Sequence, residues 1–202
     1  MNKKSIEEFV LKVEEISKIG LKYSSDPYAI DNYTQLQDLA KNFLFDQMDV
    51  KLNSDNFFIR DIYPTPNVSV RTVIFNDTRD KVLLVRERSD GGFSLPGGWS
   101  ELCLSPSESA LKEVWEETGS RCQLVRLVGV FDRWHDCKKS GLPEYIIVFE
   151  GKIISDDREP CFEILEKGYY SLECLPTWSI KNNPEQMKKI IEAAKMGKTL
   201  FD

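Results

Sequence analysis

The stretch Leu95–Gly119, LPGGWSELCLSPSESALKEVWEETG, decides how this chain of 202 residues is organised. Ser105 and Glu108 have the spacing of a capping box, in which each residue satisfies a free backbone N–H at a helix start. Pro106 suits the first helical position, and Gly119 suits the end of a helix. The pattern therefore predicts a helix that starts at Pro106 and ends at Gly119.

Three glutamates of this predicted helix lie on one face. Glu113, Glu116 and Glu117 are three and four residues apart, so their carboxylates repel one another unless a cation lies between them. The Pro-Gly-Gly turn at 96–98 can bring backbone groups close to a ligand. The pattern favours a divalent cation and a phosphate ester. The alternative is a solvated helix face, which is the usual explanation of a Glu-Glu pair.

Composition excludes several classes of protein. A hydrophobic content of 41% is enough for a packed core, and the net charge of −6 argues against binding to nucleic acid. No apolar run approaches the length that spans a membrane. The five cysteines include no CxxC pair, and the chain has one histidine, which argues against a structural zinc site or a disulfide framework. We expect a cytoplasmic protein.

The first 64 residues read as a helical extension and a linker. Apolar residues at helical period predict a helix over 5–20, with Gly20 as its stop. Asp26-Pro27 is typical of a helix start, and the second helix should run to about Met48. Two helices joined by a short turn cannot bury both apolar faces alone. We therefore expect them to pack on the rest of the chain or on another copy.

From Asn67 the apolar period changes to that of β-strands. We predict strands over 67–75, 81–86, 124–134, 145–154 and 169–172, and a closing helix that begins at Asn183. The order indicates an α/β domain over 65–202, in which a mixed sheet is interrupted by the acidic helix.

The quoted stretch resembles the Nudix box, the signature of Nudix hydrolases. The family's spacing is matched by Gly98, Glu113, Val114, Glu116, Glu117 and Gly119. Downstream, RCQLVRLVGVFDRW and YYSLECLP look like the usual strands. The segment ISKIGLKYSSDPYAIDNYTQLQDLA is similar to the helical extension of a bacterial Nudix subgroup. That subgroup acts on nucleoside diphosphates linked to another group, such as ADP-ribose or CDP-choline, and the resemblance covers nearly the whole chain.

The resemblance implies an α/β/α sandwich that hydrolyses a diphosphate linkage with Mg²⁺ or Mn²⁺ and yields a nucleoside monophosphate. Glu113 and Glu117 should ligate the metal, Glu116 should be a ligand or the partner of one, and the Gly98 region should offer a backbone carbonyl. The subgroup also implies a homodimer and a small-molecule nucleotide as the partner.

The general base is left open between Glu113 and a glutamate downstream. Glu163 and Glu166 precede the predicted strand at 169–172, where such a carboxylate often lies, and Glu166 is slightly favoured because it stands just before Lys-Gly-Tyr-Tyr. The alternative for both is a solvated loop.

Substrate contacts are expected from arginines and one aromatic residue. Arg71, Arg86 and Arg133 can bind phosphate oxygens in a bidentate manner, although surface ion pairing is the simpler role for each. Trp99 can stack on a base, and core packing is its alternative.

The loop half of the box departs from the family pattern. Cys103-Leu104 stands where the family has Gly-Glu, and Lys112 stands where the family has arginine. In the family that glutamate and arginine support the catalytic helix, and Glu101 lies near enough in sequence to substitute in part. The departure motivates an alternative function, namely a catalytically weak or inactive Nudix domain that binds a nucleotide as a sensor.

Overall fold

The computed structural model describes residues 3–48, 66–133 and 144–201, which form two compact units. The first unit is contained in residues 1–64 and the second in residues 65–202.

The first unit is a hairpin of two helices, α1 (Lys3–Tyr23) and α2 (Pro27–Met48). Asp26 caps α2, because its carboxylate accepts a hydrogen bond from the Tyr28 amide at 3.2 Å. Val10 of α1 and Ala40 of α2 are buried where the two helices pack. The predicted start of α2 is therefore confirmed.

The predicted stop at Gly20 is wrong, because α1 continues through it to Tyr23. A Cβ atom at Gly20 would lie 2.5 Å from the ring of Tyr33 on α2. The glycine thus allows close packing between the helices instead of ending one of them.

The described part of the second unit contains two sheets and two helices. Its elements are β1 (Asn67–Ile74), β2 (Lys81–Glu87), β3 (Phe93–Ser94), α3 (Pro106–Thr118), β4 (Ser120–Asp132), β5 (Glu144–Asp156), β6 (Ile164–Ser171), α5 (Pro184–Lys195) and β7 (Leu200–Phe201). The first sheet has the order β1-β5-β4-β7, and the second has the order β3-β2-β6. In the first sheet, β1 is parallel to β5 and β4 is antiparallel to β5, so the predicted mixed sheet is confirmed.

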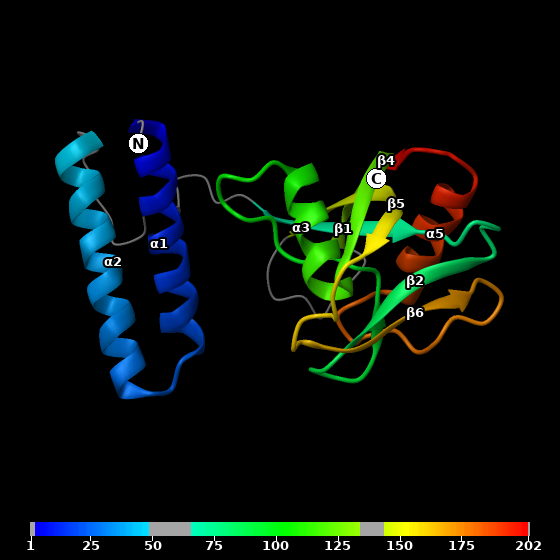
Figure 1. The fold of residues 1–202 in the computed structure, drawn as a ribbon, viewed down its shortest axis with the longest axis horizontal. Coiled ribbons are helices and arrows are strands. Elements are labelled where there is room, and N and C mark those ends of the chain that lie inside the picture. Colours follow the sequence, from blue (N-terminus) through cyan, green and yellow to red (C-terminus); the bar gives the residue numbers. More distant parts are fainter. Residues whose placement is uncertain (1–2, 49–65, 134–143, 202) are drawn as a thin grey trace. The chain divides into compact units, whose positions relative to one another are not determined.

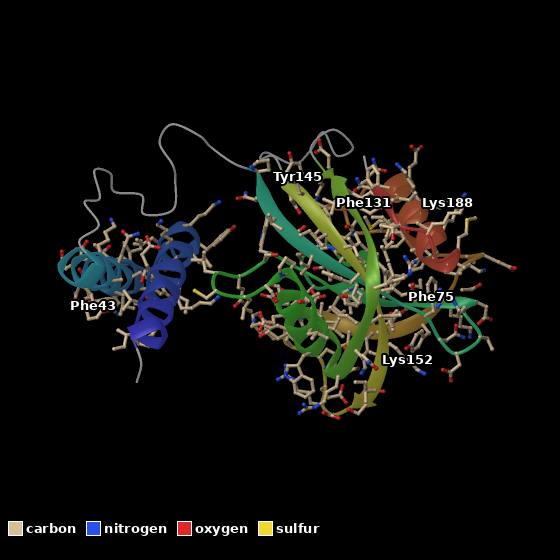
Figure 2. The ribbon with its side chains drawn as sticks, turned by 90° about the horizontal axis from the view of Figure 1, so that it is seen from above. Phe43, Phe75, Phe131, Tyr145, Lys152 and Lys188 are labelled. Carbon is tan, nitrogen blue, oxygen red and sulfur yellow. The ribbon has the colours of Figure 1, made fainter. Side chains whose placement is uncertain are left out.

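The helices α3 and α5 lie on opposite sides of the strands (Figure 1). The main core joins the strands to α5 through buried residues such as Val73, Leu84, Phe131 and Ile190. Phe131 is fully buried and lies beside α5 (Figure 2). A smaller cluster joins Val114 of α3 to β1 and β2. The layers are those of an α/β/α arrangement.

Three strands, β4, β5 and β6, are longer than their residue patterns predict. β4 begins at Ser120, directly after α3, because Ser120 pairs with Asp156 of β5. β6 begins at Ile164, because it pairs with nearly all of β2. Cross-strand pairing recruits polar residues whose own β propensity is weak. Most of the predicted linker at 49–66 and the predicted turn at 138–143 lie outside the described residues.

Within the described ranges, no helix has the length and the apolar character needed to cross a bilayer.

Candidate active site

The Pro-Gly-Gly turn forms an additional strand-like edge beside β1. The amides of Thr72 and Val70 donate to the carbonyls of Pro96 and Gly98, each at 2.9 Å. Gly97 has φ 148°, and a Cβ atom on it would lie 2.1 Å from the Val70 carbonyl oxygen. Only glycine fits at position 97, and the turn is held close against β1.

Both ends of α3 are fixed by the caps that the sequence predicts. Ser105 and Glu108 form the complete capping box at the start of the helix. Gly119 ends the helix in the left-handed region at φ 68°, where its missing Cβ leaves room for the Arg158 carbonyl. The glutamates between these caps therefore have a rigid support.

Two of the three glutamates, Glu113 and Glu117, point into the region of the Pro-Gly-Gly turn. The Gly97 amide donates to Glu117 Oε2 at 2.8 Å. The carboxylate of Glu113 lies so close to Gly98 that a Cβ atom there would be 2.6 Å from Glu113 Oε1. Helix and turn thus bring these two carboxylates and two backbone segments together.

Loss of solvent around both carboxylates disfavours their ionised forms. Desolvation raises the pKa of Glu113 to about 7, and the nearby Arg71 guanidinium only partly offsets it. Desolvation likewise raises the pKa of Glu117 to about 8, against the opposing effects of the Gly97 amide and Arg71. Perturbed carboxyl groups of this kind are concentrated at functional sites, and a cation would favour their ionised forms.

Arg71 is a buried cation beside these carboxylates. Its side chain belongs to β1, and the residue is only 4% exposed. Its Nη1 donates to the Val70 carbonyl at 3.0 Å, whereas its Nε has no hydrogen-bond partner among the described residues. A buried arginine donor without a partner is costly, which indicates that a ligand can supply the acceptor.

Glu116 points instead to a lysine that also contacts the loop before the helix. Lys112 Nζ lies 2.6 Å from Glu116 Oε2 and 2.7 Å from Glu101 Oε1. Glu101 therefore supplies a carboxylate to Lys112, although Leu104 cannot. Cys103 has φ 65°, a left-handed conformation that glycine adopts without strain, which explains physically why a glycine suits this loop position.

The two downstream glutamates occupy different environments. The prediction that both lie in a loop is wrong for Glu166, which is within β6 opposite Arg86. Its carboxylate accepts from the Tyr170 hydroxyl at 2.8 Å and lies 3.7 Å from Arg86 Nη1. Glu163 lies in the turn before β6 and is exposed.

The turn that carries Glu163 is attached to the end of α3. The Cys161 amide donates to the Glu116 carbonyl at 2.8 Å. Burial raises the pKa of the Cys161 thiol, and the charges of Glu163, Glu117 and Glu116 add to this effect. The turn that carries Glu163 is thus anchored to the last turn of α3, whereas the Glu166 carboxylate is engaged by Tyr170.

The remaining predicted substrate contacts are dispersed. Trp99 is 54% exposed and forms a β-bridge with Ser69 of β1. Ser69 and Arg71 are two residues apart on this strand, so their side chains point to the same face of the sheet. Arg86 donates through Nε to the Gly91 carbonyl at 3.0 Å. Arg133 already has partners, because its Nη1 lies 2.8 Å from the buried Glu144 and its Nη2 donates to the Lys181 carbonyl.

The carboxylate oxygens of the site suit a hard divalent cation whose other ligands are water and substrate. Among the described residues, no group of three or more His, Cys, Asp or Glu side chains is arranged to hold a metal ion by itself. Mg²⁺, however, usually binds one or two protein carboxylates and completes its shell with water and substrate phosphates. Glu113 and Glu117 match that requirement.

Comparison with known proteins agrees with this geometry. The sequence model of the NUDIX domain matches residues 65–193. The protein called "Putative ADP-ribose pyrophosphatase YjhB" of Bacillus subtilis is 30% identical over 197 residues, which are 95% of this chain and 94% of the relative. The chain therefore belongs to the Nudix family, and its second unit is a Nudix hydrolase domain.

Solved structures extend the similarity. A crystal structure of a UDP-X diphosphatase is 25% identical with a TM-score of 0.64, and the match covers 100% of this chain and 99% of that one. An ADP-ribose pyrophosphatase from Streptococcus suis is 28% identical with a TM-score of 0.59, and the match covers 68% of this chain and 100% of that one. The first of these matches includes the N-terminal helices as well as the Nudix domain.

Proposed function

We propose that this protein hydrolyses the diphosphate linkage of a nucleoside diphosphate joined to another group, such as ADP-ribose, CDP-choline or a UDP-linked sugar. The products would be a nucleoside monophosphate and a phosphorylated second product. The observation that carries the proposal is the pair of carboxylates on α3, the half-buried Glu113 and the buried Glu117, held beside the buried Arg71. The full-length similarity to relatives named for such activities supports it.

Mg²⁺ or Mn²⁺ would be held by Glu113 and Glu117, with Glu116 as a third ligand once it leaves Lys112. The Gly98 carbonyl already accepts a hydrogen bond from Val70. The amide of Gly97, by contrast, faces α3 and not β1, because it donates to Glu117. We therefore favour the Gly97 carbonyl as the backbone ligand. The bound cation would neutralise the diphosphate and make a water molecule more acidic.

Arg71 would bind a phosphate oxygen, because its Nε lacks an acceptor close to the two carboxylates. Trp99, which is exposed on the same face of the sheet edge, would stack on the base or on the second group. Arg86 remains a candidate for a more distant phosphate. Arg133 is the weakest candidate, since both ends of its guanidinium already have partners.

Glu163 is our preferred general base. It is exposed, and its turn is hydrogen-bonded to the end of α3, so its carboxylate can reach a water molecule near Glu116 and Glu117. Glu166 is the second choice, because its carboxylate already accepts from Tyr170. Replacing each by glutamine separates them: a loss of kcat of about 100-fold is expected for Glu163→Gln and little loss for Glu166→Gln.

Turnover of a panel of diphosphates tests the function. The protein is incubated with Mg²⁺ and ADP-ribose, CDP-choline or UDP-glucose, and a phosphatase converts the products to inorganic phosphate. We expect hydrolysis of at least one of them, and a loss of about 100-fold or more in Glu117→Gln, because a neutral amide cannot replace a carboxylate ligand. The Gly97 amide can still donate to the new side chain, so the fold should persist.

The matched control is Glu173→Gln, an exposed replacement outside the site, which should retain full activity. Tight nucleotide binding without turnover of any diphosphate would contradict the hydrolase. That outcome would favour the nucleotide sensor instead. The main argument for the sensor is that Leu104 stands where the family has a glutamate, but the Glu101–Lys112 ion pair weakens this argument.

The setting that we propose is the cytoplasm. Cys103, Cys122, Cys161 and Cys174 are free thiols, as a reducing compartment allows. The partner would be a small nucleotide, and a second copy of the chain would complete a homodimer.

A further inference from the structure

Lys112 connects a loop carboxylate to a carboxylate of the catalytic helix. Its ammonium lies within 2.7 Å of one oxygen of Glu101 and within 2.6 Å of one oxygen of Glu116. The three side chains are 30–40% exposed, so the ion pairs are solvated and contribute only modestly to folding stability. An arrangement of this kind is suited to exchange of partners at little cost.

The loop before the helix holds Glu101 in place. The Leu104 amide donates to the Glu101 carbonyl at 3.3 Å, which closes a tight turn with Cys103 in the left-handed conformation. The Glu101 amide also donates to the Ser109 hydroxyl at 3.4 Å. Glu101 is therefore fixed to α3 through its backbone, independently of Lys112.

The ion pairs lie in the electrostatic surroundings of the site. The charges of Glu116, Lys112 and Glu101 all act on Glu113, whose carboxylate touches Gly98. Yet Glu116 itself faces Lys112 through Oε2, so an ammonium and a divalent cation bound to Glu116 would share the negative charge of one carboxylate. A cation that binds Glu116 therefore weakens its pair with Lys112, and the ammonium then depends more on Glu101.

We propose that Glu101 is a positioning residue that retains Lys112 when Glu116 turns to a divalent cation. Lys112 occupies Glu116 while no cation is bound, and Glu101 keeps the ammonium in place after the exchange. Without Glu101, Lys112 would retain Glu116 as its carboxylate partner among the described residues and would compete with the cation for it. The proposal rests on the metal site of the proposed function, but it concerns cation affinity and not turnover.

A double-mutant cycle on Mn²⁺ binding tests this exchange, because coupling distinguishes a shared partner from the simple loss of a charge. The variants are Glu101→Gln, Lys112→Met and the two combined, with the Mn²⁺ dissociation constant measured by titration calorimetry. We expect Glu101→Gln to weaken binding about five- to tenfold when Lys112 is present and less than about twofold in the Lys112→Met background. Coulomb effects alone would give the same factor in both backgrounds.

The control is Glu159→Gln, which removes one exposed negative charge from the same unit without touching Lys112, and it should change Mn²⁺ binding less than about twofold. Thermal melting without metal should differ little between the variants, because the ion pairs are exposed. A loss of cation affinity that merely follows a loss of folding stability would overturn the proposal.

Activity assays on the same proteins separate the two proposals. Diphosphate turnover by the wild type together with an equal effect of Glu101→Gln in both backgrounds would overturn the exchange and leave the hydrolase standing. Coupled Mn²⁺ binding without turnover of any diphosphate would do the reverse. If the wild type binds no Mn²⁺, both the cation site and the exchange are wrong.

Discussion

Glu113 and Glu117 give this site a definite response to pH. Burial raises their pKa values from 4.5 to about 7 and about 8, so between pH 4.5 and 8 the folded protein without metal binds more protons than the unfolded chain. Their contribution to folding stability is fully present below about pH 4.5 and is lost as the pH rises through 7 and 8. A divalent cation opposes this loss, because it stabilises the ionised forms.

The stabilisation by Mg²⁺ should therefore grow with pH. We expect the rise in Tm produced by 10 mM MgCl₂, roughly the excess needed for a weak site, to be small at pH 6 and several degrees at pH 8.5. Differential scanning calorimetry at a series of pH values measures it. In Glu117→Gln the rise should be much smaller at every pH. An equal rise in Tm at pH 6 and pH 8.5 would contradict the assignment of these carboxylates as ligands.

Cys103 carries a strain that a single substitution can relieve. Its φ of 65° is unfavourable for a residue with a Cβ atom and is accessible to glycine. Cys103→Gly should raise the free energy of unfolding by up to about 1 kcal/mol, after allowance for the greater freedom of glycine in the unfolded chain. Urea denaturation measures the change.

The matched control for this substitution is Cys174→Gly. Cys174 is also exposed, but its backbone is not in the left-handed region, so the glycine should bring no gain in stability. Equal effects of the two substitutions would show that backbone strain at Cys103 is absent.

At the scale of elements, one buried carboxylate links the mixed sheet to the end of α5. Glu150 of β5 lies 2.6 Å from Arg79 Nη1 and 2.8 Å from Arg126 Nε. Both arginines also donate to the Ala194 carbonyl in the last turn of α5, at 3.0 and 3.1 Å. The cations thus satisfy a terminal carbonyl of the helix while Glu150 neutralises them.

Glu150→Gln should destabilise the domain by roughly 2–3 kcal/mol, below the full cost of breaking a buried ion pair because Arg79 is partly solvated. Equilibrium denaturation in guanidinium chloride measures the loss. The matched control Glu192→Gln removes an exposed charge from α5, where its pair with Lys188 is 3.9 Å long, and it should change stability by less than about 0.5 kcal/mol. A similar loss in both variants would disprove the role of Glu150.

Local signals predicted the helices of the Nudix domain well, because caps act within a few residues. The predicted boundaries at Ser105, Gly119 and Asn183 are found in the structure. Strand boundaries failed where pairing with a distant strand decides them, as it does for Glu166 in β6. Gly20 was misread for the same reason, since its role depends on Tyr33 of the other helix.

In the whole molecule, the N-terminal hairpin leaves an apolar stripe on each helix uncovered within its own unit. Phe9, Ile16 and Tyr23 of α1 recur at helical spacing on the exposed side, and Leu36 and Leu39 do so on α2. The hairpin's own packing uses other positions, such as Val10 and Ala40. A second copy of the chain remains our proposal for the cover of these stripes.

Light scattering coupled to size-exclusion chromatography tests the homodimer. We expect about twice the mass of one chain for the wild type, and the mass of one chain for Leu39→Glu, because a charge at a residue now 66% exposed would be buried in the dimer. The control Asp38→Glu changes a neighbouring residue without changing its charge and should remain dimeric. A wild type with the mass of one chain would disprove the second copy.

The sequence predicts the part of the candidate site that lies on α3. Spacing alone placed the three glutamates on one helix, but it could not show that Glu116 faces Lys112 while Glu113 and Glu117 face the turn. Nor could it show that Arg71 is buried beside them, since β1 reaches the site only through the tertiary fold. Pairing across the fold decides which charged residues meet.

The glycines around the site have a consequence for the evolution of related sequences. Gly97 and Gly119 are required because a Cβ atom would collide with the carbonyls of Val70 and Arg158, and these collisions do not depend on any reaction. A duplicated copy that had lost hydrolysis would still need them to fold, whereas glutamine could replace Glu117 and still accept from the Gly97 amide. In a diverging lineage, the glycines would thus record the inheritance of the fold, and the glutamates would record whether selection for catalysis continues.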